Sequence, residues 1–167
     1  PWGMSFVNDQ TLLITEKTGG IIRIDMNTGN KFEIEHNLDF YYYGQGGLLD
    51  ILYHEGFVYV TYSQVIKKQI GNYRIQLIGS TAIARGKLLE NGIIDFQDIF
   101  VSSPPLKINK HWGARIIIKD EYLYASLGDR GYGMIAQDPT KHPGSIIRIK
   151  LDGLPPSDNP KQKKYIE

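Results

Sequence analysis

The chain has 167 residues, which is enough for one domain with a core of its own. Its 19 Lys and Arg residues balance 18 Asp and Glu residues, and a net charge of +1 argues against nucleic acid or an anionic membrane surface as a partner. The absence of cysteine excludes disulfides, thiolate metal sites and cysteine nucleophiles. No apolar run reaches the roughly 18 residues of a membrane span.

Short β-rich runs separated by turn residues fill the chain. Gly, Asn and Asp between the runs supply the positive φ angles that tight hairpins need. The expected strands are 3–7, 11–16, 20–25 and 31–34, then 47–53, 57–63, 80–88 and 94–100, then 114–118, 122–127 and 144–150. The polar stretch 64–79 is interpreted as an insertion between two strands of the second group.

Three imperfect copies of a four-stranded unit, with almost no helical periodicity, favour a β-propeller over a β-sandwich. Trp2 and Gln45 are 43 positions apart, within the range of about 40 to 50 that is usual for propeller blades. The predicted fold is all-β, with four-stranded antiparallel blades at approximately 1–37, 45–103 and 111–167. Because about three blades cannot close a ring, we expect a piece of a longer protein, with exposed blade faces that favour self-association.

The segment from Lys110 to Gly131 is the strongest candidate for chemistry. Runs 114–118 and 122–127, joined by a short polar turn, predict an antiparallel hairpin. Such a hairpin returns to the edge that it left, so His111 before it and Asp129 after it should lie at the same end. A carboxylate that accepts a hydrogen bond from one imidazole nitrogen leaves the other as a general base.

Each candidate also has a plain structural interpretation. His111 could be an ordinary loop histidine, and Asp129 a turn residue, because Gly-Asp-x-Gly sequences form turns readily. Gln45 has flanking glycines that would let a ligand approach the backbone, yet it could be a simple loop amide. The run Tyr41–Tyr43 resembles a stacking platform, although aromatic loops on β proteins mostly serve packing. The sequence spacing of Asp50, Asp138 and His142 does not match that of a recognised metal site.

One residue stands just before the first strand of each copy: Trp2 in the first copy, Gln45 in the second and His111 in the third. The first strand of a propeller blade lines the central channel, so these residues should converge on one mouth. An aromatic ring, an amide and an imidazole gathered there suit a polar, ring-shaped ligand.

Several motifs, in order along nearly the whole chain, resemble one family. They are Pro1-Trp2-Gly3-Met4-Ser5-Phe6, Gly44-Gln45-Gly46-Gly47-Leu48-Leu49-Asp50, Ser80-Thr81-Ala82-Ile83-Ala84-Arg85, His111-Trp112-Gly113-Ala114-Arg115, Gly128-Asp129-Arg130-Gly131, Ala136-Gln137-Asp138 and Asp158-Asn159-Pro160. This set resembles the soluble glucose/sorbosone dehydrogenases, which are pyrroloquinoline quinone dependent aldose sugar dehydrogenases.

The resemblance implies a six-bladed propeller, pyrroloquinoline quinone and calcium as cofactors, an aldose substrate and a periplasmic or secreted location. It also implies that His111 takes the proton of the sugar C1 hydroxyl as hydride passes to the quinone. Asp129 would orient that histidine, and Gln45 would contact the reacting end of the sugar. The cofactor-binding residues stay unknown, because the family places most of them beyond Glu167. We therefore expect this chain to be inactive alone.

Two positions depart from the family pattern: Ala114, where a glycine is common, and Ser145, where a lysine is common.

Three other functions stay open. The chain could belong to a non-catalytic ligand-binding propeller, to a calcium-dependent lactone hydrolase, or to a purely structural propeller. The hydrolase would need acidic and Asn ligands around a central metal, whereas Trp2, Gln45 and His111 stand at the expected mouth.

Overall fold

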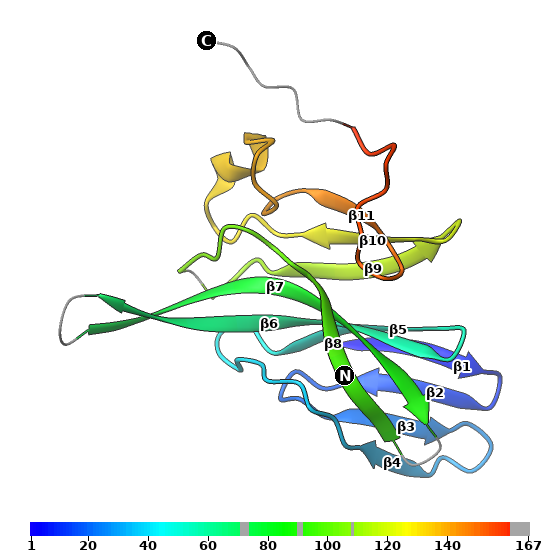
Figure 1. The fold of residues 1–167 in the computed structure, drawn as a ribbon. Helices are drawn as coiled ribbons and strands as arrows, with labels where there is room; N and C mark the ends of the chain where they lie inside the picture. Colours follow the sequence, from blue (N-terminus) through cyan, green and yellow to red (C-terminus); the bar gives the residue numbers. More distant parts are fainter. Residues whose placement is uncertain (71–73, 90–91, 108, 161–167) are drawn as a thin grey trace.

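The computed structural model describes residues 1–70, 74–89, 92–107 and 109–160, and it consists almost entirely of antiparallel β-sheet (Figure 1). The first sheet has the order β1-β2-β3-β4. Its strands are β1 (Gly3–Asn8), β2 (Thr11–Thr15), β3 (Ile21–Asp25) and β4 (Lys31–Ile34). Each strand is paired with the next along the chain, so the sheet is a simple meander.

The second and third sheets repeat this topology, with orders β5-β6-β7-β8 and β9-β10-β11. The second contains β5 (Leu48–His54), β6 (Phe57–Ile70), β7 (Arg74–Leu89) and β8 (Gly92–Val101). The third contains β9 (Gly113–Lys119), β10 (Tyr122–Leu127) and β11 (Ile146–Lys150), with a 3-10 turn η1 (Gly133–Gln137) between its last two strands.

Buried threonines on the second strand of a sheet join its first strand to the first strand of the next sheet. The hydroxyl of Thr15 on β2 accepts from the N–H of Gly3 on β1 at 2.9 Å and donates to the carbonyl of Leu49 on β5 at 2.7 Å. Thr61 on β6 accepts from the N–H of Asp50 at 2.8 Å and donates to the carbonyl of Ala114 on β9 at 2.8 Å. The hydroxyls of these two threonines thus hold β1, β5 and β9 around one axis. This arrangement confirms the predicted β-propeller of antiparallel blades.

Asp50 provides a second link between the blades. Its buried carboxylate accepts from Arg115 Nη1 at 2.8 Å and from the N–H of Ile116 at 2.9 Å. On its other side lies Gly3 of β1, where a Cβ atom would stand only 2.7 Å from Asp50 Oδ1. Asp50 is therefore a bridge among three blades, and a glycine at position 3 makes room for it.

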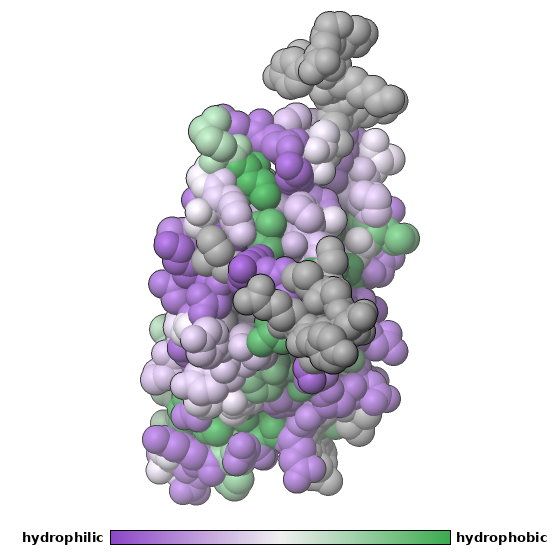
Figure 2. All heavy atoms as spheres, turned by 90° about the vertical axis from the view of Figure 1, so that its left-hand side faces the viewer, coloured by the Kyte–Doolittle hydropathy of each residue, from purple (hydrophilic) through white to green (hydrophobic). Residues whose placement is uncertain are grey.

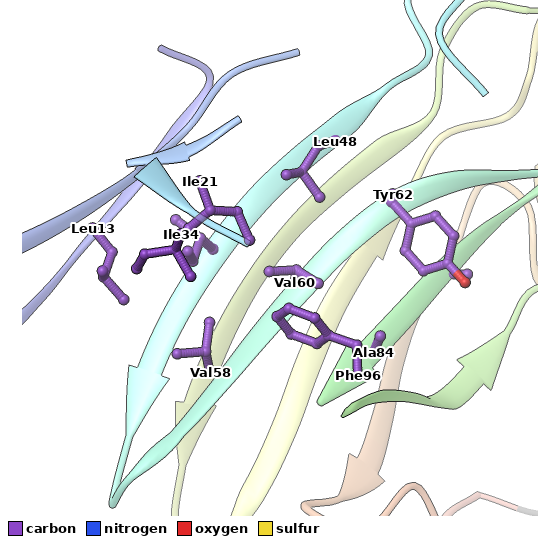
Figure 3. Packing of buried hydrophobic residues seen from close by; sticks show 11 residues of the cluster. Leu13, Ile21, Ile34, Leu48, Val58, Val60, Tyr62, Ala84 and Phe96 are labelled. Atoms are coloured by element: carbon purple, nitrogen blue, oxygen red, sulfur yellow. The ribbon is translucent and has the colours of Figure 1, made fainter. Parts of the chain in front are cut away.

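Apolar layers fill the spaces between the sheets. Figure 3 shows the first layer, in which Leu13, Ile21 and Ile34 of the first blade face Val58 and Val60 of the second. A second layer lies between the second and third sheets and includes Tyr59, Ile83, Ile116, Leu123 and Ile149. Apolar side chains are buried on both faces of the middle blade, and this packing fixes the relative orientation of the three sheets. The sheets in turn position the loops at their ends.

The third strand of each sheet carries an arginine, and one contact is common to all three of them. Each guanidinium lies over an aromatic ring of an adjacent strand. The pairs and their distances to the ring centre are Arg23 over Phe32 at 5.2 Å, Arg85 over Phe57 at 4.8 Å and Arg148 over Tyr122 at 4.8 Å. The sequence repeat therefore reflects a repeated cation–π contact.

The expected insertion at 64–79 is not a loop. Strands β6 and β7 continue through it, with unbroken antiparallel register from the pair Phe57 and Lys87 to the pair Ile70 and Arg74. Val65, Ile66 and Ile78 are β-branched residues that favour extended backbone. The sequence interpretation gave too much weight to polar residues, and the stretch forms a long hairpin (Figure 1).

Two expectations from the sequence concern the end of the third blade and membrane-spanning segments. Residues 161–167, the last part of the expected third blade, lie outside the described residues, as does the basic run Lys161–Lys164 within them. In the described part of the chain, no helix has the length and apolar character required to cross a bilayer.

Candidate active site

His111 and Asp129 are in direct contact at the end of the third blade where β9 begins. Imidazole Nδ1 lies 2.8 Å from carboxylate Oδ1, and the imidazole is half exposed. The hairpin of β9 and β10 explains this proximity, because it brings the residue before β9 back beside the loop after β10. The structure therefore places the two predicted residues together, at a position that solvent reaches.

The backbone around the pair is tightly specified. The N–H of Arg130 donates to the carbonyl of His111 at 3.2 Å, and His111 has a positive φ of 52°. A Cβ atom at Gly128 would stand only 1.9 Å from the His111 carbonyl oxygen, so this crossing requires glycine. A histidine in the left-handed region is uncommon, and such conformations persist where surrounding contacts impose them.

Gln45 binds the backbone of the histidine loop. Its Oε1 accepts a hydrogen bond from the N–H of His111 at 2.8 Å, and its own N–H donates to the carbonyl of Asn109 at 3.0 Å. Gln45 is exposed and precedes β5, so it belongs to the second blade, whereas His111 belongs to the third. The predicted convergence of these two residues is therefore present in the structure.

Trp2 lies near the same loop through Lys17, a residue that sequence reasoning missed. Lys17 Nζ stands 5.3 Å from the ring centre of Trp2 and 5.1 Å from that of Tyr42, and it donates to the carbonyl of Gly44. A cation held between two aromatic rings is stabilised by both. Lys17 thus connects the first blade to the loop that carries Gln45.

Arg130 is a second residue that the sequence did not single out. It is buried, it stacks on the Trp112 ring at 3.2 Å, and it donates to the carbonyls of Gly79 at 2.8 Å and Lys110 at 3.1 Å. Burial lowers the pKa of Arg130 to about 10. Because Arg130 directly follows Asp129, these bonds hold the loop that carries Asp129 against the long β6–β7 hairpin of the second blade. The motif Gly-Asp-Arg-Gly was the available signal.

The electrostatics of the pair favour an ionised carboxylate beside the histidine. The N–H of Gly131 donates to Asp129 Oδ1 at 2.9 Å, and this bond is the main reason why the pKa of Asp129 is lowered, followed by the contact with His111. A neutral imidazole that donates from Nδ1 to this carboxylate carries its free electron pair on Nε2. The pair can therefore accept a proton from a polar ligand.

The other titratable candidates have structural surroundings. His142 Nδ1 accepts from the N–H of Ser103 at 3.0 Å, and burial lowers the pKa of its imidazole. Asp138 accepts from Thr140 and pairs with Lys141 at 2.8 Å within one turn. Within residues 1–70, 74–89, 92–107 and 109–160, no group of three or more His, Asp or Glu side chains could hold a metal ion.

The family model for glucose/sorbosone dehydrogenases matches residues 1–166. The chain belongs to the glucose/sorbosone dehydrogenase family. Among curated relatives, this family member is 29% identical over 169 residues to aldose sugar dehydrogenase YliI of Escherichia coli K12, covering 96% of this chain and 43% of the relative. The resemblance seen in the motifs is thereby confirmed.

Solved structures agree with this family assignment. The soluble aldose sugar dehydrogenase of Escherichia coli in its apo form matches 99% of this chain and 48% of its own length, with 28% identity and a TM-score of 0.84. The pyrroloquinoline quinone bound aldose sugar dehydrogenase of Streptomyces coelicolor matches 96% of this chain and 47% of its own length, with 26% identity and a TM-score of 0.79. The chain spans less than half the length of these relatives.

Proposed function

We propose that the complete protein containing this chain is a quinoprotein that oxidises the C1 hydroxyl of an aldose sugar, with pyrroloquinoline quinone as hydride acceptor. The observation that carries the proposal is the 2.8 Å contact between His111 Nδ1 and Asp129 Oδ1. Relatives whose names describe aldose sugar dehydrogenases, one of them bound to the quinone, support the substrate and the cofactor.

The proposed mechanism assigns a separate task to each residue. His111 Nε2 takes the proton of the C1 hydroxyl, and Asp129 holds the ring in the tautomer that leaves this nitrogen unprotonated. Gln45 positions the reacting end of the sugar while its Oε1 holds the backbone of His111. Bound quinone supplies the two-electron acceptor for the C1 hydrogen. Fixing the sugar beside a base lowers the entropic part of the barrier.

The chemistry of these residues fits the sugar end of that reaction. An imidazole paired to a carboxylate lies beside an amide that holds its backbone, and the Lys17 ammonium binds the loop that carries this amide. In the described residues, we assign no ligand set to the quinone or to calcium. Calcium is therefore proposed only as a second cofactor of the complete protein.

A dye-linked oxidation assay tests this function in the complete protein, using a panel of aldoses with and without added quinone. Quinone-dependent reduction of the dye by at least one aldose supports an enzyme. A non-catalytic ligand-binding propeller is the alternative, and it would bind sugars without any turnover. Intact sugar oxidation after His111→Ala would contradict the role of the base.

We further propose that the 167-residue chain alone is inactive, since it spans less than half of each relative. A spectral titration with quinone and calcium should show no tight binding, and stoichiometric tight binding would refute this point. We also propose a periplasmic or secreted location, which fractionation of the complete protein in its native cell would test. Recovery in the cytoplasmic fraction would overturn it.

Self-association of the isolated chain is a related proposal. The open face of the third sheet exposes Ile117 by 57% and Ile146 by 75% of their surface. Exposed apolar side chains on an uncovered sheet face favour association. Light scattering over a concentration series should show a mass above that of one chain, and Ile117→Lys with Ile146→Lys should reduce it. A concentration-independent monomer would contradict the proposal.

A further inference from the structure

A cavity opens between the segment that follows the first blade and the long hairpin of the second blade. It has a volume of about 590 Å³, within the range of small-molecule sites. Its wall consists of residues 37–41, parts of β6 and β7, and Phe96 and Asp98 of β8. Neither His111 nor Asp129 lines it. The cavity is therefore separate from the pair to which the proposed function assigns proton transfer.

Asp98 presents a carboxylate in a fixed position at this cavity. The hydroxyl of Tyr62 donates to Asp98 Oδ1 at 2.5 Å, and Gln64 Nε2 donates to Asp98 Oδ2 at 2.8 Å. Burial, followed by the contact with Asp98, raises the pKa of Tyr62 well above its ordinary value, so the phenol keeps the proton that it donates. Asp98 itself is exposed, and each of its oxygens has lone pairs for a further donor. The carboxylate is thus oriented by the protein and accessible to a ligand.

The charge of the cavity is negative. Asp39 is a second exposed carboxylate among the lining residues, and Lys67 is the only lining side chain with a positive charge in the described part of the chain. The ion pairs formed among the described residues do not include Asp39, Asp98 or Lys67. Because two carboxylates stand against one ammonium, the excess negative charge favours a cationic ligand.

Apolar side chains form the floor of the cavity. Leu38 and Phe40 pack against the first apolar layer, and Phe96 belongs to that layer. Figure 3 shows Phe96 and Tyr62 among the side chains of the layer. Aromatic ring faces attract cations, and a hydrocarbon chain is stabilised when such a floor removes it from water. The floor therefore suits a cation that carries an apolar stem.

The surface around the cavity limits the size of its ligand. The cavity lies toward the end of the second blade where β5 begins, since the N–H of Tyr41 donates to the carbonyl of Ser63 on β6 at 2.9 Å. Figure 2 views the molecule from the side where β1 and β9 begin, and this face is largely hydrophilic, with apolar atoms in small groups. A small cationic ligand fits such a face better than a broad apolar partner surface does.

A protonated amine on a short hydrocarbon stem combines the charge and the apolar contact that these residues favour. We propose that the cavity binds a primary ammonium group at Asp98, with its hydrocarbon stem against Phe40 and Phe96. Two sources share this chemistry, namely a free aliphatic amine and a lysine side chain of a partner protein. The inference goes beyond the proposed sugar oxidation and does not depend on it.

Titration calorimetry of the complete protein with ligands of matched length tests the charge of the ligand. Pentylamine, pentanol and hexanoate share a five-carbon stem and end in a positive, a neutral and a negative group. Pentylamine should bind about tenfold more tightly than the other two, because hydrogen bonds between charged groups are the stronger ones. Nα-acetyl-lysine N-methylamide distinguishes the two sources of the ammonium. Binding at least as tight as that of pentylamine supports a partner's lysine, and weaker binding supports a free amine.

Two variants change the charge of the cavity in opposite directions. Asp98→Asn keeps an acceptor for the Tyr62 hydroxyl but removes the charge, so pentylamine should bind about tenfold more weakly. Lys67→Gln removes the competing ammonium from an exposed side chain, so pentylamine should bind about threefold more tightly.

Asp95→Asn is the matched control, because Asp95 is exposed on the same strand as Asp98 and does not line the cavity. It should leave the affinity for pentylamine unchanged. Equal affinity for the three five-carbon ligands, no binding of either amine, or the native affinity in a folded Asp98→Asn protein would overturn the site. If Asp98→Asn does not fold, unchanged or weaker binding in Lys67→Gln decides against it. The dye-linked assay measures sugar oxidation separately, so failure of this site leaves the proposed function untouched.

Discussion

Gln45 Oε1 accepts a hydrogen bond from the backbone N–H of His111 at 2.8 Å, although the two residues are 66 positions apart. The N–H of Gln45 in turn donates to the carbonyl of Asn109 at 3.0 Å. Two loops from different blades are thus held together by bonds in both directions. The candidate active site is assembled between blades, so the packing of the propeller decides its geometry.

Gln45→Glu separates the two roles of this amide. A carboxylate can still accept from the His111 N–H, but it cannot donate to a sugar, and its negative charge favours the protonated imidazole. We expect kcat/KM to fall by about tenfold to a hundredfold, with the acid limb of the pH profile moved to higher pH. Steady-state kinetics from pH 5 to 9 in the complete enzyme measure both effects. An unchanged profile would argue against contact with the base.

Lys17→Met should loosen the loop that carries Gln45. The variant loses the hydrogen bond to the Gly44 carbonyl and the cation between Trp2 and Tyr42. We expect kcat/KM to fall by about tenfold, because each cation–π contact is worth roughly 0.5–1 kcal/mol at exposed sites. Lys17→Arg should restore most of the activity. Equal losses in both variants would mean that the charge is not the important feature.

Thr61→Val should destabilise the contact between the second and third blades. The substitution keeps the shape but leaves the N–H of Asp50 and the carbonyl of Ala114 without their buried partner. We expect a loss of about 1–3 kcal/mol in the free energy of unfolding, measured in urea. Thr61→Ser should retain most of it. Ser126→Ala, at the matching place on the open face of β10, should cost less than about 0.5 kcal/mol.

Asp129→Asn should change how stability depends on pH. The native pKa of Asp129 is lowered from 3.8, mainly by the N–H of Gly131 and then by His111. Its carboxylate therefore contributes stability above pH 3.8, and this contribution disappears as pH falls through the lowered pKa. The stability difference between native and variant protein should be constant above about pH 5 and should shrink in acid. A difference that persists unchanged to pH 2 would contradict this assignment.

The parts of the fold that depend on local sequence were predictable. Alternating β-rich runs and turn residues predict the meanders, and the return of one hairpin predicts that His111 and Asp129 share an end. The polar character of residues 64–79 was misleading, because strand pairing in the long hairpin outweighs it. The β-branched residues Val65, Ile66 and Ile78 were the available signal for extended backbone in this stretch.

The contacts between blades could not be derived from a single sequence. The bridge from Asp50 to Arg115 spans 65 positions, and the bond from Arg130 to the Gly79 carbonyl spans 51. Nothing near Lys17 indicates that its ammonium lies between Trp2 and Tyr42. Such contacts depend on how three sheets fan around an axis, which repeat lengths predict only coarsely.

Kinetics of His111→Ala in the complete, quinone-loaded protein test the central claim most directly. If the imidazole held by Asp129 is the base, kcat for aldose oxidation should fall by about 10²- to 10⁴-fold while sugar binding changes little. His111→Gln should be equally slow, because an amide cannot accept the proton. Retention of kcat within about threefold in both variants would contradict the account, since another group would then be accepting the proton.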